Sequence, residues 1–300
     1  MNKKRVYIIS FFIVSAYCLG VISQKYNWFP LKQIKSLTYE KKEVKKDFDT
    51  LSIKDFSNEN FTVLFTFGQS NAANFGQTRH TCLHNVYNWH NDTIYKAKDP
   101  LKGADGVLGS TWSRLGDLLV ESGFSENVLI VSLAMGNSTI SDWSLGGKYH
   151  KKLIKTIEKL NHQNIEVDYI LWHQGETDNI NNTSKKDYID SFFKMYNSLN
   201  FNNKKPPFFI AIASYIPREE LLVEKQKGTD TIIQNAQKTI AEKAPNIHLG
   251  PNTDELIQSY YRHDGLHFST LGLDKHAEKW LHTLKNYKEG ILNYRTSKID

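Results

Sequence analysis

The stretch FTVLFTFGQSN at residues 61–71 decides how the chain is expected to fold. Its first seven residues are apolar or β-branched, which is typical of a buried strand, and Gly68 ends the run. Four more short runs of this kind are predicted as strands, at residues 127–133, 167–172, 207–213 and 246–249.

Apolar residues recur at helical spacing between these runs. Four stripes predict amphipathic helices: Leu153, Ile154, Ile157 and Leu160; Tyr188, Phe192 and Tyr196; Ile232, Ile233, Ala236 and Ile240; and Ala277, Trp280, Leu281 and Leu284. Strands that alternate with helices pair in parallel through right-handed crossovers. We therefore expect a three-layer α/β/α domain, flavodoxin-like, around a mostly parallel sheet of five strands. The long segment 77–110 is expected to be an excursion over the site.

Composition excludes several classes of protein. The chain has 300 residues, of which 40% are hydrophobic and 23% charged, with 17 Gly, 7 Pro and 2 Cys. These values argue against disorder, a collagen-like repeat and a disulfide-based scaffold. The fold must depend on a hydrophobic core.

The net charge of +6 comes from one end of the chain. Residues 1–46 contain ten Lys or Arg against two Glu, a net charge of +8, which leaves −2 for residues 47–300. The body of the protein therefore has no basic excess of the kind that nucleic acid attracts, and we expect no nucleic-acid partner.

The N-terminal segment resembles a membrane signal. A basic region at residues 1–5 precedes an uncharged, mostly apolar run at 6–24, long enough to nearly span a bilayer. It is expected to be an uncleaved signal anchor, with a cleaved signal peptide as the alternative. Residues 25–58 are expected to form a Lys-rich tether, 59–290 the globular domain and 291–300 a tail. The positive-inside rule places the domain outside the cytoplasm, periplasmic or extracellular, anchored to the membrane or secreted after cleavage.

Three loops follow predicted strands, where the chemistry of such sheets collects. Gly68-Gln69-Ser70-Asn71 is expected to lift Ser70 on a tight turn before a helix whose N-terminus favours an oxyanion. The same tetrapeptide also fits a simple helix cap. The second loop is Ala134-Met135-Gly136-Asn137-Ser138-Thr139-Ile140, and the third is His173-Gln174-Gly175-Glu176-Thr177-Asp178.

A fourth motif lies near the C-terminus, Asp264-Gly265-Leu266-His267. A serine nucleophile needs a base, and a neutral imidazole needs a carboxylate to fix its tautomer. An Asp three residues before a His can supply that carboxylate within one turn. His263 lies four residues before His267, but Gly265 argues against a helix between them, so no metal site is expected.

Together and in this order, the motifs resemble the SGNH hydrolase superfamily, and within it the sialate O-acetylesterase-like branch of carbohydrate acetylesterases. The resemblance covers residues 61–286. It implies that Ser70 is the nucleophile, His267 the base and Asp264 its orienting carboxylate.

The same resemblance implies an oxyanion hole formed by the backbone N–H groups of Ser70 and Gly136 and the Gln174 side chain. Asn71, Asn137, Trp143 and Glu176 are candidate substrate contacts, although Glu176, with Asp178, fits a loop-holding role better. Asn137 stands where the family commonly has a second glycine, and Ala72 where it often has Met. Trp89, Trp112, Trp143 and Tyr149 could stack on sugars or pack in the core.

The implied reaction is removal of O-acetyl groups from a carbohydrate, such as sialic acid or an envelope or extracellular glycan, through an acyl-serine. It requires no metal and no organic cofactor. Two alternatives remain open at this point. They are a glycan O-acetyltransferase that uses the same triad and a non-catalytic glycan-binding protein.

Overall fold

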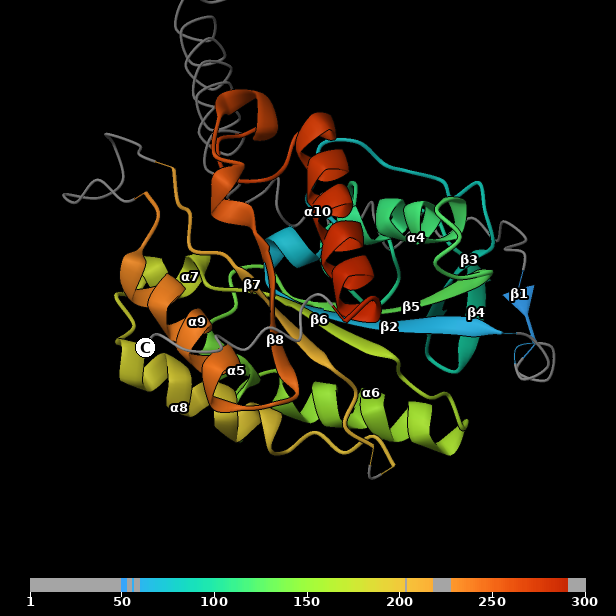
Figure 1. Ribbon diagram of the computed structural model, residues 1–300, viewed down its shortest axis with the longest axis horizontal. Coiled ribbons are helices and arrows are strands. Elements are labelled where there is room, and N and C mark those ends of the chain that lie inside the picture. The colour runs from blue at the N-terminus through green and yellow to red at the C-terminus, as the bar shows by residue number, and fades with distance from the viewer. Residues whose placement is uncertain (1–49, 53–55, 57–59, 203, 218–227, 291–300) are drawn as a thin grey trace, which may run out of the picture. The chain divides into compact units, whose positions relative to one another are not determined.

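A single eight-stranded sheet organises the protein in the computed structural model, which describes residues 50–52, 56, 60–202, 204–217 and 228–290 (Figure 1). Its strand order is β1-β4-β3-β5-β2-β6-β7-β8. The strands are β1 (Thr50–Leu51), β2 (Phe61–Gly68), β3 (Val86–His90), β4 (Thr93–Lys96), β5 (Asn127–Ala134), β6 (Tyr169–His173), β7 (Phe208–Ile212) and β8 (Ile247–Asn252).

The strands β3, β5, β2, β6, β7 and β8 are parallel, and β4 and β1 add an antiparallel edge. The five strands predicted from sequence all occur in the parallel part, but the prediction of a five-stranded sheet was wrong. The segment 77–110, expected as an excursion, itself contributes β3 and β4. The turn between them consists of Asn91 and Asp92, whose φ values are 46° and 66°. Two such residues form the tight turn that suits a β-hairpin.

Helices cover both faces of the sheet (Figure 1). One face carries α4 (Thr111–Glu121) and α10 (Thr270–Lys288), and the other carries α5 (Ile140–Trp143), α6 (His150–His162), α8 (Lys185–Tyr196) and α9 (Thr231–Lys243). The short α7 (Glu176–Ile180) follows β6, and single 3₁₀ turns lie at η1 (Ser70–Ala72), η2 (Thr253–Glu255) and η3 (Ser259–Tyr261). The four helical stripes of the sequence lie in α6, α8, α9 and α10, whereas α4 was not predicted.

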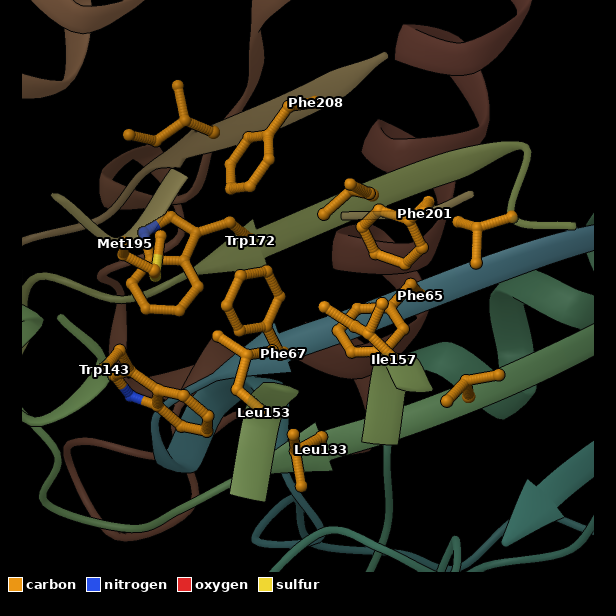
Figure 2. Packing of buried hydrophobic residues seen from close by; sticks show 14 of the residues in the cluster. Phe65, Phe67, Leu133, Trp143, Leu153, Ile157, Trp172, Met195, Phe201 and Phe208 are labelled. Atoms are coloured by element: carbon orange, nitrogen blue, oxygen red, sulfur yellow. The ribbon is translucent and has the colours of Figure 1, made fainter. Parts of the chain in front are cut away.

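Alternation along β2 divides the core between the two faces. Phe65 and Phe67 join the cluster under α6, α8 and α9, and Leu64 points to the cluster under α4 and α10. Figure 2 shows the first cluster, in which the Phe67 ring packs against Trp143 and Trp172 with ring centroids 5.6 and 4.4 Å apart. The central strand is thus covered on both sides, which leaves the carboxyl edge of the sheet for the site.

The described part of the chain begins earlier than the predicted domain. Within the expected tether 25–58, Thr50 and Leu51 pair with β4, and Phe56 packs in the core. The folded unit therefore starts before residue 59. The regions 1–5 and 6–24, the rest of the tether up to residue 49 and the tail 291–300 lie outside the described residues. Among the helices that are described, none has the length and apolar character to cross a bilayer.

Candidate active site

Ser70 lies at the carboxyl end of β2, on a turn that only glycine permits. Gly68 has a φ of +139°, and a Cβ at this position would lie 2.0 Å from the His173 carbonyl oxygen of the neighbouring strand β6. The Gln69 N–H donates to that same oxygen at 3.0 Å. The chain then turns sharply into η1, which holds Ser70 with 4% of its surface exposed.

The helix expected after this turn is absent. A single 3₁₀ turn, Ser70–Ala72, follows β2, and the next helix is α4, which starts at Thr111. One turn has few aligned peptide dipoles, so the predicted helix-dipole contribution at Ser70 was wrong. Donors for an oxyanion must therefore come from individual N–H groups.

His267 and Asp264 form a close pair in the loop before α10. The His267 Nδ1 lies 2.6 Å from Asp264 Oδ2, and Asp264 Oδ1 accepts from the backbone N–H groups of His267 and Leu266 at 2.6 and 2.9 Å. Partial burial would raise the pKa of Asp264, but these bonds and the nearby imidazole outweigh it and hold the pKa well below its usual range. The ionised carboxylate keeps a proton on Nδ1 and leaves Nε2 as the basic nitrogen.

Phe75 joins the Ser70 turn to the His267 loop. Its ring stacks on the His267 imidazole, with centroids 5.2 Å apart and planes inclined by 22°. Two further bonds tie the same segments: His263 Nε2 lies 3.1 Å from the Phe75 carbonyl oxygen, and the Gln77 N–H donates to Phe268 O at 2.9 Å. The hydroxyl of Ser70 makes no hydrogen bond within the described residues. Catalytic bonds of this kind are often long before substrate binds.

In the described part of the chain, two groups of side chains have ligand atoms that converge. His263, Asp264 and His267 have theirs within 4.8 Å of one another, closer than the sequence indicated. A bend at Gly265, whose φ is +85°, brings the two rings together without a helix. The Asp264 oxygens are already occupied by the three hydrogen-bond donors of this loop, which a cation would have to displace.

The second group is His80, Cys82 and Asp117. His80 Nε2 lies 2.7 Å from Asp117 Oδ2, and the same carboxylate accepts from the Leu83 and His84 N–H groups. Cys82 is buried and its thiol donates to a backbone oxygen at 3.3 Å, and burial raises the pKa of the thiol. These hydrogen bonds explain why the three side chains converge, because they hold α4 against the segment before β3.

Gly136 follows β5, on a loop that contacts the end of β2. The Met135 N–H donates to Gly68 O at 2.9 Å, which places the loop after β5 against the end of β2. The Gly136 N–H donates to Asp105 Oδ2 at 3.3 Å. Asp105 would have to release the Gly136 N–H before that N–H could donate to an oxyanion. Sequence reasoning missed Asp105, although its place between Gly103 and Gly106, in a loop expected over the site, was a usable signal.

Gln174 is fully buried and fully bonded. Its Nε2 has three acceptors, Asp178 Oδ2 at 2.5 Å, Ser138 O at 3.1 Å and Gln69 Oε1 at 3.2 Å. The two N–H bonds of this amide are already shared among three acceptors. For Gln174 to donate to an oxyanion, as predicted, these hydrogen bonds would have to rearrange. Asp178 also accepts from the Ile140 N–H at 2.8 Å. Gln174 and Asp178 therefore tie the second and third loops together.

A chain of buried polar side chains lies beneath the Ser70 turn. The Trp280 N–H donates to His276 Nε2 at 2.9 Å, and His173 Nδ1 lies 3.3 Å from the same nitrogen. On its other side, His173 Nε2 lies 3.1 Å from Glu176 Oε1. His173 thus lies between the His276 ring and the Glu176 carboxylate. Sequence reasoning assigned no role to His173. A His and a Glu three residues apart at the end of a strand were a usable signal for this contact.

Asn71 and Glu176, two of the predicted substrate contacts, bond to each other. Asn71 Nδ2 donates to Glu176 Oε1 at 2.8 Å, and both residues are at most 5% exposed. Burial would raise the pKa of Glu176, but the His173 charge and the bonds from His173 and Asn71 outweigh it and lower the pKa to about 2. The pair holds the residue after Ser70 to the third loop.

Trp143 is a core residue, and its prediction as a substrate contact was wrong. It is fully buried, its indole N–H donates to Ser138 Oγ at 2.9 Å, and its ring packs on Phe67 and Trp172 (Figure 2). Trp89 and Trp112 are also buried. Of the predicted contacts, Asn137 is the exposed one, with a φ of +57° at the tip of the second loop.

Similar proteins are known among the carbohydrate esterases. The sequence matches the family described as "SASA: Carbohydrate esterase, sialic acid-specific acetylesterase" over residues 60–285. None of the curated proteins matches. Among solved structures, a protein from Arabidopsis thaliana is 17% identical with a TM-score of 0.58, covering 76% of this chain and 100% of its own. A GDSL-like lipase assigned in Parabacteroides merdae is 11% identical with a TM-score of 0.50, covering 75% and 95%. These structures support the fold. With the family matched across the whole catalytic region, the chain belongs to the sialic acid-specific acetylesterase family of carbohydrate esterases and is a carboxylic ester hydrolase.

Proposed function

We propose that the protein removes O-acetyl groups from a carbohydrate through an acyl-serine formed on Ser70. The observation that supports this most is the Asp264–His267 pair, 2.6 Å apart, on a loop that Phe75 joins to the Ser70 turn. In this reaction His267 Nε2 takes the Ser70 proton as Oγ attacks the ester carbonyl. The imidazolium then protonates the departing sugar oxygen, which leaves an acetyl-serine.

Deacylation reverses the roles. His267 takes a proton from water, the resulting hydroxide attacks the acetyl carbonyl, and acetate leaves as Ser70 regains its proton. The Ser70 and Gly136 backbone N–H groups are proposed to stabilise the oxyanion in both steps. Loss of one such donor typically costs about 3 kcal/mol of transition-state energy. Glu176, Asp178 and Gln174 hold the loops that present these groups.

The location of the activity is inferred from the sequence. The apolar run at residues 6–24 and the basic residues before it favour an exported, membrane-anchored enzyme. Its substrate would then be a glycan outside the cytoplasm. The family match is to an esterase, and no observation in the described residues favours the acetyltransferase or the binding-protein alternative.

Acetate release tests this proposal. The full-length protein and its Ser70→Ala variant are incubated with an O-acetylated sugar and with a small aryl acetate. We expect turnover of both substrates by the wild type and none above background by the variant. Equal turnover by the variant, or a folded wild type that releases no acetate from either substrate, would refute the serine esterase mechanism.

A further inference from the structure

The ring of Phe75 lies between the proposed base and the proposed oxyanion loop. On one side it stacks on the His267 imidazole, with centroids 5.2 Å apart and planes inclined by 22°. Its edge reaches Gly136, since a Cβ at that glycine would lie 3.2 Å from Phe75 Cζ and 3.5 Å from Cε2. Phe75 itself is half-buried. The ring therefore bounds the space between His267 and the Gly136 N–H.

Two glycines make room for this ring. A Cβ at Gly106 would lie 3.0 Å from Phe75 Cδ2, and one at Gly136 would lie 3.2 Å from Cζ. Both distances are shorter than the optimal separation of about 3.5–4.0 Å between carbon atoms. The ring therefore fills the space that these two glycines leave open.

The backbone of Phe75 is held on both sides. Before it, the Asn74 N–H donates to Asp105 O at 2.9 Å. After it, Gly76 and Gly109 exchange N–H···O bonds of 2.9 and 2.8 Å. These bonds restrict movement of the backbone, and the stacked imidazole restricts rotation of the ring. The ring is thus a fixed surface of the site.

The proposed reaction brings an acyl group to this surface. An acyl carbon bonded to Ser70 Oγ directs its carbonyl oxygen at the Gly136 N–H and its leaving oxygen at His267 Nε2. Phe75 borders both of these groups, so it is an apolar surface within reach of the acyl chain. Ser70 is only 4% exposed, which leaves little open space around it for a longer chain.

We propose that Phe75 is the residue that sets acyl specificity, because its ring forms the wall of the acyl site and limits the acyl group to acetyl. This rests on the proposed function and adds the residue that determines its acyl preference. A methyl group fits beside the ring, whereas each further methylene has to displace a ring that is held in place. One methylene in a hydrophobic pocket changes discrimination by about 10–200-fold.

The test compares aryl esters of acetate, propionate and butyrate, which share one leaving group and differ only in the acyl chain. The wild type is expected to prefer acetate over butyrate by about 100-fold or more in kcat/KM. Phe75→Ala should raise the butyrate-to-acetate ratio by about 100-fold, and Phe75→Leu should raise it by a smaller factor. Each ratio is measured on one enzyme sample, so an inactive fraction cancels from it.

Phe193→Ala is the matched control. Phe193 is also half-buried, but it lies in α8 and packs against the core cluster on the other face of the sheet. The same ring is removed, so a general loss of packing would act in both variants. We expect Phe193→Ala to keep the wild-type ratio.

Three results would overturn the proposal. They are a wild type that hydrolyses butyrate as well as acetate, an unchanged ratio in Phe75→Ala, and an equal shift in Phe193→Ala. If Phe75→Ala does not fold, the ratio in Phe75→Leu decides in the same way. A Phe75 variant that changes the preference between a sugar acetate and an aryl acetate, but not the acyl ratio, would place the ring against the leaving group and also refute the proposal.

Failure of the proposed function looks different. In that case the folded wild type would hydrolyse none of the esters and carry no acyl group on Ser70, and both proposals would be wrong. Hydrolysis of all three esters at similar rates through an acyl-Ser70 would refute only the role of Phe75.

Discussion

Replacement of Glu176 by Gln is expected to destabilise the fold by about 3 kcal/mol at neutral pH. The folded protein lowers the pKa of Glu176 from 4.5 to about 2. At about 1.4 kcal/mol per pKa unit, this shift corresponds to roughly 3 kcal/mol in favour of the charged form.

The same pKa shift predicts how the stability difference between the wild type and Glu176→Gln depends on pH. Because the folded pKa lies below the unfolded one, the stabilisation is complete above about pH 4.5 and is lost as the pH falls toward about 2. The gap between wild type and Glu176→Gln should therefore narrow from about 3 kcal/mol at neutral pH to about 1.4 kcal/mol near pH 3.

Urea denaturation of both proteins across this pH range is the assay, with Glu255→Gln as the matched control. Glu255 is 2.6 Å from Lys279 but exposed, so its loss should change stability by less than about 1 kcal/mol. At neutral pH, Glu176→Gln should also lower the Tm by roughly 6–12 °C. A variant as stable as the wild type, or a gap that stays constant with pH, would refute the lowered pKa of Glu176 and the contacts that cause it.

Three further predictions concern the site. Asp264→Asn should lower kcat by about 10²–10⁴-fold with an unchanged circular dichroism spectrum, because His267 loses the carboxylate that fixes its tautomer; wild-type kcat in this variant would exclude the pair from catalysis. Gly68→Ala should lower the free energy of unfolding in urea by about 3 kcal/mol or more, since its Cβ would lie 2.0 Å from the His173 oxygen; full stability would show that the turn is not as described. Gln174→Ala should cost about 1–3 kcal/mol in the same assay, because buried acceptors lose their donor; an intact fold with a kcat reduced about 10²-fold or more would instead assign the side chain to the oxyanion hole.

The alternation of apolar runs was enough to predict the α/β fold, because each buried parallel strand is a near-continuous apolar run. It missed β3, in which Asn88 and His90 interrupt the apolar pattern. The hairpin turn at Asn91 and Asp92 was the stronger signal, since two consecutive residues that tolerate positive φ favour a tight turn.

Within the site, the contact between residues close in sequence could be predicted, whereas the contact between residues far apart in sequence could not. Asp264 and His267 are three residues apart, so their pairing follows from local geometry. The bond from Asn71 to Glu176 joins residues 105 positions apart and depends on which loops meet. Trp143 shows the opposite error, because a position near a predicted loop does not tell whether an aromatic ring faces solvent or the core.

The central claim is that the acyl group passes through Ser70, and trapping the intermediate tests it most directly. The full-length protein is mixed with an aryl acetate, quenched in acid within the first turnovers, digested and analysed by mass spectrometry. The account predicts one added acetyl group on the peptide that contains Ser70, absent from Ser70→Ala and longer-lived in Asp264→Asn. Steady release of acetate with no acetylated Ser70 peptide at any quench time would contradict it.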